Sequence, residues 1–462
     1  MKLIARQADV AYLDTHLWLP TLRVGSLDHI RGTLTFEKDR FTLVEAWESA
    51  PSHIKVPRNY LSAASRERLP FPVVDSRFKA FPRVELTSKV ILDAKHPGQT
   101  FQSEASRALL NTYDGILCLR CGAGKTVVAL HSAAQLKTPI LVVVGDKGLA
   151  AQWTKEIRWC LGLKDDDIGK VGDGKFEWKK SVTVAVVNTL AQRSLDGTLP
   201  PEMLQHFGVV ICDEAHIMAA PYFNAAVPPF QGRRWGLSAT PIREDQFDPL
   251  LRYTFGDVVY TYLTPDLIPT VYFKKIDTRI NLSDPLERAQ VEDISGEVHR
   301  NKLYGFFARE RPDRVATIAK DIADAVAAGR NVIALTHSRD MCEALAAHFP
   351  DAGVCHADVK PAERLRRISE CNPVIAIMQL GKQALDKPSL DTLMLCEPTT
   401  KEGVLQQIMG RILRPSESKK PPIMIVYEDR YIRELFMMCA KIRRKFNKWP
   451  SHKGGRIPYK VI

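Results

Sequence analysis

Short segments that suit phosphate chemistry follow one another along the chain in a fixed order. The first is glycine-rich, follows an apolar run, and reads Gly122, Ala123, Gly124, Lys125 and Thr126. The backbone N–H groups of such a loop, at the start of a helix, suit an anionic phosphate. We expect Lys125 to reach the β and γ phosphates of ATP, and the Thr126 hydroxyl to ligate Mg²⁺. Leu119 stands where the first glycine of this motif is usual.

The second segment is acidic and follows the apolar run 209–212; it reads Asp213, Glu214, Ala215 and His216. The carboxyl end of a strand beside a phosphate loop is where a parallel α/β sheet binds its ligand. We expect Asp213 to hold Mg²⁺, through a water molecule, and Glu214 to act as general base on the attacking water. His216 could link this part of the site to its other part or to Ser238 and Thr240. An acidic helix N-cap is the alternative for the tetrapeptide taken alone.

The last segment carries two arginines. A helix is expected over 404–413, with Arg411 and Arg414 three positions apart on one face of it, after Gln407. Two guanidiniums can spread over a γ phosphate and stabilise the transition state, which contributes about 10³ to 10⁵ in rate in other NTPases. We therefore assign a catalytic role to all three residues. A solvated basic helix face is the alternative.

These segments need a scaffold that brings them together. From about residue 96 the chain alternates short apolar runs, rich in β-branched residues, with stretches of helical length, which predicts a parallel sheet covered by helices on both faces. The first series places strands at 116–119, 140–144, 182–187 and 209–212 and helices at 105–110, 126–136 and 148–161. A second series begins near residue 260, with strands at 331–336, 374–378, 392–396 and 423–427 and helices at 315–328, 339–348 and 404–413. The charged stretch 280–312 reads as mostly helical.

The first 95 residues have a different pattern. Residues 33–36 and 41–44 predict a β-hairpin around a polar turn, and the prolines that follow predict short helices. We predict an α/β fold of two tandem RecA-like domains, 96–258 and 259–462, preceded by a small α+β accessory domain, 1–95, that binds DNA.

Composition bounds the class of protein. The chain has 462 residues, a formal net charge of +12, 45% hydrophobic and 26% charged residues, which is typical of a globular protein with a polyanionic partner. No apolar run is long enough for a transmembrane helix, so we expect a cytoplasmic protein, in the host cytoplasm if it is viral. The pair Cys118 and Cys121 allows a metal or redox interpretation, but both lie in or beside the phosphate loop, and reduced free thiols are expected.

The end of the chain, from residue 440, is basic and contains the aromatic residues Phe446, Trp449 and Tyr459. Cations interleaved with rings suit a nucleic-acid strand, because bases stack on aromatic side chains. A solvated helix end followed by a frayed tail is the alternative.

The ordered set resembles that of superfamily 2 helicases of the DEAH type, over residues 96 to 430. The resemblance implies an ATP site shared between two RecA-like domains, with a nucleic-acid strand laid across both. It makes Gln102 the adenine reader and Asp386 a further nucleotide ligand, although Gln383 and Ala384 replace the usual pair before Asp386. It also assigns nucleic-acid contacts or coupling to Lys147, Asn188, Thr189, Ser238, Thr240, His337 and Ser338.

Within the superfamily, the chain looks most like phage UvsW-type and XPB-like DNA helicases. This likeness implies a 3′–5′ helicase or translocase that remodels branched or forked DNA in replication, recombination or repair, acting as a monomer. An RNA helicase of the same superfamily, or a nucleic-acid-binding protein with a silent ATP site, are the alternatives.

Overall fold

The computed structural model describes residues 7–38, 41–96, 98–120, 122–239, 248–264, 267–293, 296–378, 387–414, 416, 419–449 and 457–462. The chain divides into two compact units. Unit 1 comprises Met1–Leu119 and Ala123–Tyr262, and unit 2 comprises Arg120–Gly122 and Leu263–Ile462. The predicted division into three domains stays a prediction.

The N-terminal part of unit 1 is built on a five-stranded sheet of its own, in the order β5-β6-β2-β1-β7. Its strands are β1 (Ala11–Leu13), β2 (His16–Pro20), β5 (Glu48–Ser49), β6 (His53–Pro57) and β7 (Val73–Asp75). Leu17 and Leu19 of β2 are buried while the residues between them are not, so one face of the sheet carries the core. The helices beside it are α1 (Leu27–Leu34) and α2 (Ala63–Glu67).

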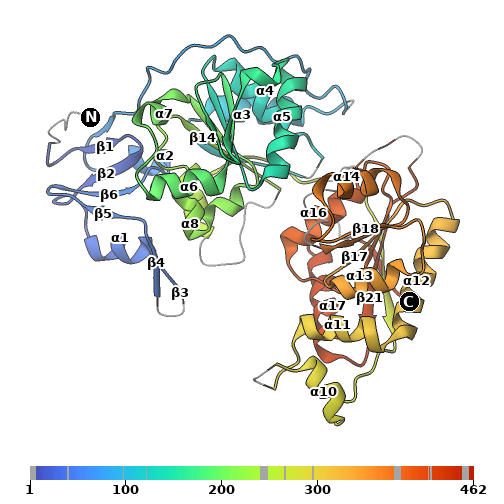
Figure 1. Ribbon diagram of the computed structural model, residues 1–462. Helices are drawn as coiled ribbons and strands as arrows, with labels where there is room; N and C mark the ends of the chain where they lie inside the picture. The colour runs from blue at the N-terminus through green and yellow to red at the C-terminus, as the bar shows by residue number, and fades with distance from the viewer. Residues whose placement is uncertain are drawn as a thin grey trace. The chain divides into compact units, whose positions relative to one another are not determined.

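The predicted N-terminal hairpin is confirmed. Strand β3 (Thr35–Lys38) pairs antiparallel with β4 (Phe41–Glu45), and the two project from the N-terminal sheet beside α1 (Figure 1). Helix α2, which follows the hairpin, is short, as the prolines around it predict.

The second sheet of unit 1 has eight strands in the order β11-β10-β12-β9-β13-β14-β8-β15. Every neighbouring pair is parallel except β10 and β11. The strands are β8 (Gly115–Leu119), β9 (Ile140–Val144), β10 (Ile168–Gly172), β11 (Lys175–Glu177), β12 (Val182–Val186), β13 (Val209–Cys212), β14 (Arg233–Ser238) and β15 (Val258–Tyr262).

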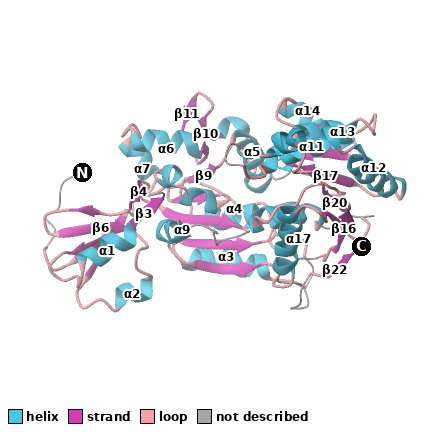
Figure 2. Cartoon of the chain, turned by 90° about the horizontal axis from the view of Figure 1, so that it is seen from below, coloured by secondary structure: helices cyan, strands magenta, loops and turns pink. Residues whose placement is uncertain are grey.

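Helices cover both faces of this sheet, as Figures 1 and 2 show. In β9, Ile140, Val142 and Val144 join one core, and Leu141 and Val143 join the other, as period-two side chains require. One core is covered by α3 (Phe101–Asn111), α4 (Lys125–Gln135) and α5 (Lys147–Leu161). The other is covered by α6 (Val187–Leu195), α7 (Pro201–His206), η2 (Ala215–Ala219) and α9 (Asp248–Phe255), with α8 (Pro221–Asn224) against η2; η1 (Asp165–Asp167) precedes β10.

Unit 2 contains a seven-stranded, all-parallel sheet in the order β18-β19-β17-β20-β21-β16-β22. Its strands are β16 (Thr270–Ile276), β17 (Val332–Thr336), β18 (Gly353–Cys355), β19 (Val374–Ile377), β20 (Thr392–Leu395), β21 (Ile423–Asp429) and β22 (Tyr459–Val461). One core is shared with α10 (Pro285–Val291), α11 (Arg300–Glu310), α12 (Pro312–Ala327) and α13 (Arg339–Ala346). The other is shared with α14 (Pro361–Glu370), α16 (Glu402–Ile412) and α17 (Arg433–Phe446).

The α/β class with two parallel sheets is therefore confirmed, but the basic tail differs from its prediction. Phe446 is fully buried, and Trp449 and Tyr459 pack against the same core. Tyr459 belongs to β22, which adds an edge strand to the sheet beside β16. The rings expected to stack on bases are used to attach the end of the chain to unit 2. Among the described residues, no helix is both long and apolar enough to cross a lipid bilayer.

Candidate nucleotide-binding site

The site in unit 1 forms where three neighbouring parallel strands end. Strands β13, β14 and β8 lie side by side, and their carboxyl ends lead into Asp213, Ala239 and the phosphate loop. Ser238, the last residue of β14, is in register with Cys118 of β8, whose thiol donates to the Ala239 carbonyl (3.8 Å). Burial raises the pKa of Cys118 to about 11, so its thiol is neutral. The fold thus brings the first two predicted segments to one edge of the sheet.

The phosphate loop has the backbone that its glycines allow. Gly122 and Gly124 have φ angles of 81° and 83°, a region that residues with a Cβ avoid. Gly124 is the N-cap of α4, and Lys125 and Thr126 are the first two residues of that helix. The positive end of the helix dipole therefore points into the loop. The Lys125 ammonium donates to the Leu119 carbonyl (3.1 Å), across the loop it belongs to.

The side chain of Gln102, on α3, supports this loop by a hydrogen bond. Its Nε2 donates to the Ala123 carbonyl (2.9 Å), and its Oε1 accepts the Asp93 backbone N–H (2.7 Å). The Asp93 carboxylate in turn accepts the backbone N–H groups of Gln102 (2.8 Å) and Ser103 (3.0 Å). A Cβ on Gly124 would lie 2.6 Å from the Gln102 amide nitrogen. The structure therefore shows Gln102 bracing the loop, and its reading of adenine stays a prediction.

Asp213 is buried beside a tryptophan. Its backbone N–H donates to Val143 of β9 (3.0 Å), and its Oδ2 accepts the indole N–H of Trp153 (2.7 Å). Burial raises the pKa of Asp213 above its ordinary value and the Glu214 carboxylate raises it further, while Trp153 and Lys125 lower it. The Lys125 ammonium of the phosphate loop thus favours the charged form of the Asp213 carboxylate.

Glu214 sits in a conformation rare for its type. It has φ 47° and ψ 53°, the left-handed region, and stands as the N-cap of η2. Such a conformation costs about 1–3 kcal/mol and is concentrated at functional sites. Its Oε2 lies 3.3 Å from His216 Nδ1, and both side chains keep about a quarter of their surface exposed (21% and 26%). A partly exposed carboxylate positioned by a strained turn suits a base that must meet water.

Three of the residues predicted to contact nucleic acid in unit 1 lie on helices that follow strands, whereas Ser238 ends β14. Lys147 begins α5 and forms an exposed ion pair with Asp173. A pocket of about 410 Å³ next to it is lined by α5, β10 and β12. Asn188 and Thr189 lie in the first turn of α6, where Tyr222 donates its hydroxyl to the Asn188 carbonyl (3.4 Å). Their contacts with nucleic acid stay predictions.

In unit 2, His337 and Ser338 follow β17. The Ser338 hydroxyl caps α13 by accepting the Met341 N–H (3.0 Å). The His337 ring stacks on Tyr304 of α11 with centroids 5.4 Å apart, and its backbone N–H donates to Glu397 (2.8 Å). Burial raises the pKa of Glu397 to about 7 despite the nearby Arg314 guanidinium. The stretch 280–312, which had no assigned role, thus supplies the ring that positions His337.

The arginine segment differs from its prediction in one respect. Helix α16 ends at Ile412, so Gln407 and Arg411 lie on it but Arg414 follows its C-cap, because Leu413 leaves the helical conformation. The chain after the helix is held by Lys419, which donates to the Arg414 carbonyl (2.8 Å). Burial lowers the pKa of Lys419 to about 8. Thr240, Asp386 and the Gln383–Ala384 pair lie outside the described residues.

Two residues that support the site had no predicted role. Trp153 reads as an apolar core position of α5, and it is indeed buried, but its N–H orients the acidic segment sixty positions later. Asp93 lies in a proline-rich, irregular stretch and fixes Gln102 by side-chain contacts. Neither partnership has a local sequence signal, since each joins segments that only the fold brings together.

The chain is similar in sequence to several known proteins. Residues 95–243 match the family model described as "Type III restriction enzyme, res subunit". Over 329 residues the chain is 26% identical to "DNA 3'-5' helicase XPB" of Kineococcus radiotolerans, covering 68% of this chain and 57% of the relative. It is 23% identical to the "Putative ATP-dependent RNA helicase QP509L" of African swine fever virus, covering 82% of this chain and 80% of that one.

Among solved structures, that of S. cerevisiae Dbp5 bound to RNA and ADP BeF3 is similar with a TM-score of 0.54 and 13% identity, over 78% of this chain and 89% of that chain. At this identity the likeness concerns the fold alone. The chain spans 57% of the length of the bacterial relative. The sequence relatives are named as helicases, and the solved structure shares the fold of this chain.

Proposed function

We propose that the chain is a nucleic-acid-dependent ATPase that works as a 3′–5′ DNA helicase or translocase on forked or branched DNA. The observation that carries the ATPase is the meeting of the phosphate loop, Asp213 and Glu214 at the carboxyl ends of β8 and β13, two parallel strands with β14 between them. No one of these segments is specific alone. Their convergence on one sheet edge is what a nucleotide-hydrolysing site requires.

The chain's own groups can be given roles in hydrolysis. The loop N–H groups and the Lys125 ammonium bind the phosphates, because both are cationic or dipolar donors at a helix start. Glu214 accepts the proton of the attacking water, and His216, 3.3 Å away, orients that carboxylate.

Mg²⁺ fits the donor set of the site. It prefers oxygen ligands, and the Thr126 hydroxyl and the Asp213 carboxylate supply them. Asp213 is buried next to a second carboxylate, which raises its pKa, and a divalent cation would offset that cost. When bound, Mg²⁺ would neutralise charge on the phosphate oxygens, while Trp153 keeps the Asp213 carboxylate oriented.

Arg411 and Arg414 of unit 2, with Gln407, are proposed to complete the site by contacting the γ phosphate in the closed state. Such contacts would make nucleotide binding and hydrolysis close and open the two units. Alternate closing and opening would move one strand along the groups assigned to nucleic acid, including Lys147, Asn188 and His337. Arg414→Ala is expected to lower turnover while nucleic-acid binding stays intact.

The DNA and polarity parts of the proposal are supported by the name of the bacterial relative, a DNA 3′–5′ helicase. The N-terminal sheet is a candidate for the part that meets a fork, because it is a separate folded element attached to unit 1. The test is an unwinding assay with forks, four-way junctions and tailed duplexes of both polarities. Preferential unwinding of 3′-tailed or forked DNA supports the proposal, and exclusive action on 5′-tailed DNA refutes the polarity.

An RNA helicase is the second candidate, favoured by the viral relative, which is similar over most of both chains. Comparing ATPase stimulation by single-stranded DNA and RNA of the same sequence separates the two. Stimulation by RNA alone would replace the DNA proposal.

A further inference from the structure

Buried charged side chains attach the N-terminal sheet to the eight-stranded sheet of unit 1. Asp114 stands immediately before β8 and accepts hydrogen bonds from Arg58 (2.8 and 2.6 Å), from the Asn59 amide (2.9 Å) and from the Arg234 backbone N–H (2.8 Å). The Arg58 and Asp114 side chains are 1% and 5% exposed. A buried pair of this kind holds only when its remaining donors are also satisfied, and Arg58 Nη2 donates further to the Gly232 carbonyl (2.9 Å).

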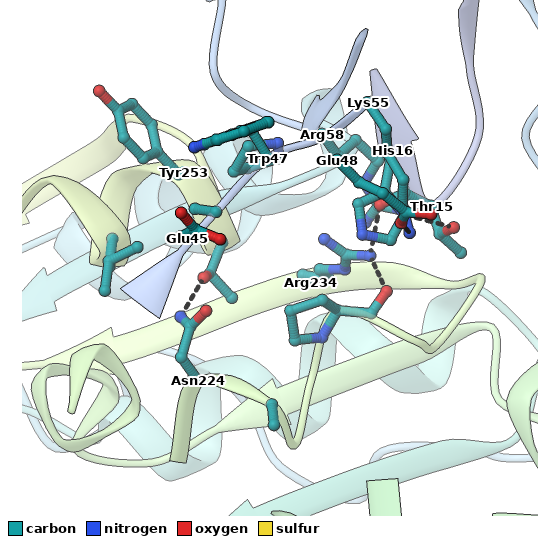
Figure 3. Close-up of a pocket in the computed structure, with 16 residues that line it drawn as sticks. Thr15, His16, Glu45, Trp47, Glu48, Lys55, Arg58, Asn224, Arg234 and Tyr253 are labelled. Atoms are coloured by element: carbon teal, nitrogen blue, oxygen red, sulfur yellow. Dashed lines mark hydrogen bonds and ion pairs between the residues drawn. The ribbon is translucent and has the colours of Figure 1, made fainter. Parts of the chain in front are cut away.

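On one side of Arg58 the junction leaves only a small pocket. Figure 3 shows a small pocket there, about 220 Å³, where Arg58 and Arg234 lie among Trp47, His16 and Glu48. Arg234 donates to the Thr15 carbonyl (3.0 Å), between β1 and β2, and to the Pro228 carbonyl (2.6 Å), between α8 and β14. Backbone carbonyls from both sides of the junction therefore accept hydrogen bonds from its guanidinium.

On the other side of Arg58 lies a larger pocket, about 710 Å³, which we call the junction pocket. Four arginines line it (Arg58, Arg66, Arg77, Arg252), and Asp114, Asp257 and Asp75 pair with the first, fourth and third of them, which leaves an excess of one positive charge (4 − 3 = 1). Because the walls exclude part of the solvent, this excess is focused into the pocket.

Two arginines of the junction pocket, with Arg233 beside it, lie over an aromatic ring. The Tyr113 ring has Arg77 at 4.0 Å, Arg233 at 5.1 Å and Arg58 at 5.2 Å from its centroid. Stacking on a ring fixes the plane of a guanidinium, so that N–H groups not used by protein acceptors can be offered to an oxyanion. The side chain of Arg77 is also held by Asp75, through two hydrogen bonds of 2.8 and 2.7 Å.

Burial and the neighbouring cations disfavour the charged form of Arg66. Burial lowers the pKa of Arg66, and the neighbouring Arg77 and Arg58 lower it further, against the opposing effect of Asp114. Arg66 points its Nη1 at the Leu61 carbonyl (2.7 Å), which fixes the side chain at the pocket wall. A bound phosphate would turn this like-charge repulsion into pairing.

The location separates this pocket from the nucleotide site. Asp114 precedes β8 and Asp257 precedes β15, so the junction pocket lies at the amino ends of these two parallel strands, whereas the phosphate loop follows the carboxyl end of β8. An anion bound here is therefore not the phosphate of the hydrolysed ATP.

We propose that the junction pocket binds a backbone phosphate of the nucleic-acid substrate, with Arg66 and Arg77 as its ligands. The proposal rests on the proposed function, since it supplies a second contact for the same nucleic acid. It places a substrate contact on the N-terminal part of unit 1, next to the buried Arg58–Asp114 pair that joins this part to the eight-stranded sheet. Free inorganic phosphate is the other source of the same chemistry.

The test uses the full chain and two double variants. Arg66→Ala with Arg77→Ala removes the proposed ligands, and Arg68→Ala with Lys79→Ala removes two exposed charges nearby that do not line the pocket. Binding of a fluorescent forked DNA is titrated by anisotropy at several salt concentrations, and thermal unfolding checks that each variant folds. A further variant, with lysine in place of both Arg66 and Arg77, keeps the charges and serves where the alanine variant does not fold.

Each lost phosphate contact lowers the slope of log K against log salt by about 0.9, so the pocket variant should lose about one to two units of slope and about tenfold or more in affinity at low salt. The control should keep the wild-type slope, and the lysine variant should keep most of it. Wild-type slope and affinity in the folded pocket variant would overturn the proposal. A result specific to inorganic phosphate would also overturn it. In that case phosphate added at constant ionic strength would raise the thermal stability of the wild type but not of the pocket variant, while the salt slope of DNA binding would be the same in both.

These outcomes are separable from failure of the proposed function. An unchanged slope with normal DNA-stimulated ATPase activity removes the junction pocket alone. Absence of nucleic-acid-stimulated ATPase activity in the wild-type chain removes the helicase proposal, whichever slope the variants show.

Discussion

Trp153 gives a quantitative test of how the acidic segment is prepared. Its indole N–H donates to Asp213 at 2.7 Å in a buried setting. Trp153→Phe keeps a ring in the core and removes this bond to a charged acceptor, which is worth about 1.5–3 kcal/mol. One pKa unit corresponds to about 1.4 kcal/mol, so the pKa of Asp213, already raised by burial, should rise by a further unit or two.

The sign follows from the protonation state that works. Only the carboxylate of Asp213 can hold Mg²⁺, and the indole bond favours the carboxylate, so its loss favours the inactive acid. The acid limb of the ATPase pH profile should therefore move to higher pH by about one to two units. The Mg²⁺ concentration for half-maximal rate should rise about 10- to 100-fold, the usual effect of losing a partner of a metal ligand.

The assay is steady-state ATP hydrolysis across pH and Mg²⁺ concentration, with single-stranded DNA present. Trp159→Phe is the matched control, because Trp159 lies on the same helix and is 50% exposed. An acid limb and a Mg²⁺ dependence unchanged in Trp153→Phe would refute the reasoning. The same would follow if the control shifted as much as the variant.

Further predictions concern the loop, the junction and unit 2. Gly124→Ala should weaken binding of an ATP analogue at least about tenfold, as measured by calorimetric titration. Gly174 also has a positive φ, 75°, but no atom of the described residues lies within 4 Å of the position its Cβ would take, so Gly174→Ala should lose only about 1–2 kcal/mol of stability in denaturant unfolding. Arg58→Ala should lower the free energy of unfolding by about 3–5 kcal/mol, because it leaves the buried Asp114 carboxylate without its cation. Arg158→Ala, which breaks an exposed ion pair, should lower it by less than about 1 kcal/mol. Equal losses in the two variants would contradict a stabilising role of the Arg58–Asp114 pair. The pKa of Glu397 is raised from 4.5 to about 7, so between these pH values the folded state keeps a proton that the unfolded chain has lost. The free energy of unfolding should therefore fall by about 3 kcal/mol as pH rises through that window. Glu397→Gln should abolish this pH dependence in urea unfolding, and a pH dependence that persists would assign it to another group.

The sequence predicts the parts of the fold whose signal is local. Continuous apolar runs such as 140–144 and 209–212 predict buried parallel strands, and the structure places them as β9 and β13. Strand β14 was missed because it begins with Arg233 and Arg234, whose charges hide a central strand; the second of these is buried only because backbone carbonyls surround it. The edge strand β22 was missed because three residues carry too little pattern.

The site divides in the same way. Lys125, Asp213 and Glu214 were predictable, since each follows a strand in a motif with a chemical reason. The bracing of the loop by Gln102 and the strained backbone of Glu214 were not, because they depend on contacts between distant segments and on a turn. For the aromatic residues of the tail, composition predicted a nucleic-acid-binding surface, but the rings pack into or against the core of unit 2 instead.

The central claim is that the unit 1 site hydrolyses ATP with Glu214 as base and that nucleic acid controls the rate. The most direct measurement is ATP turnover by the wild-type chain and by Glu214→Gln, with and without single-stranded DNA, alongside binding of labelled ATP. We predict stimulation of the wild type by DNA, and in Glu214→Gln unchanged ATP binding with turnover lowered about 10² to 10⁴-fold. Near-normal turnover in the variant, or a wild-type rate that no nucleic acid changes, would contradict the account.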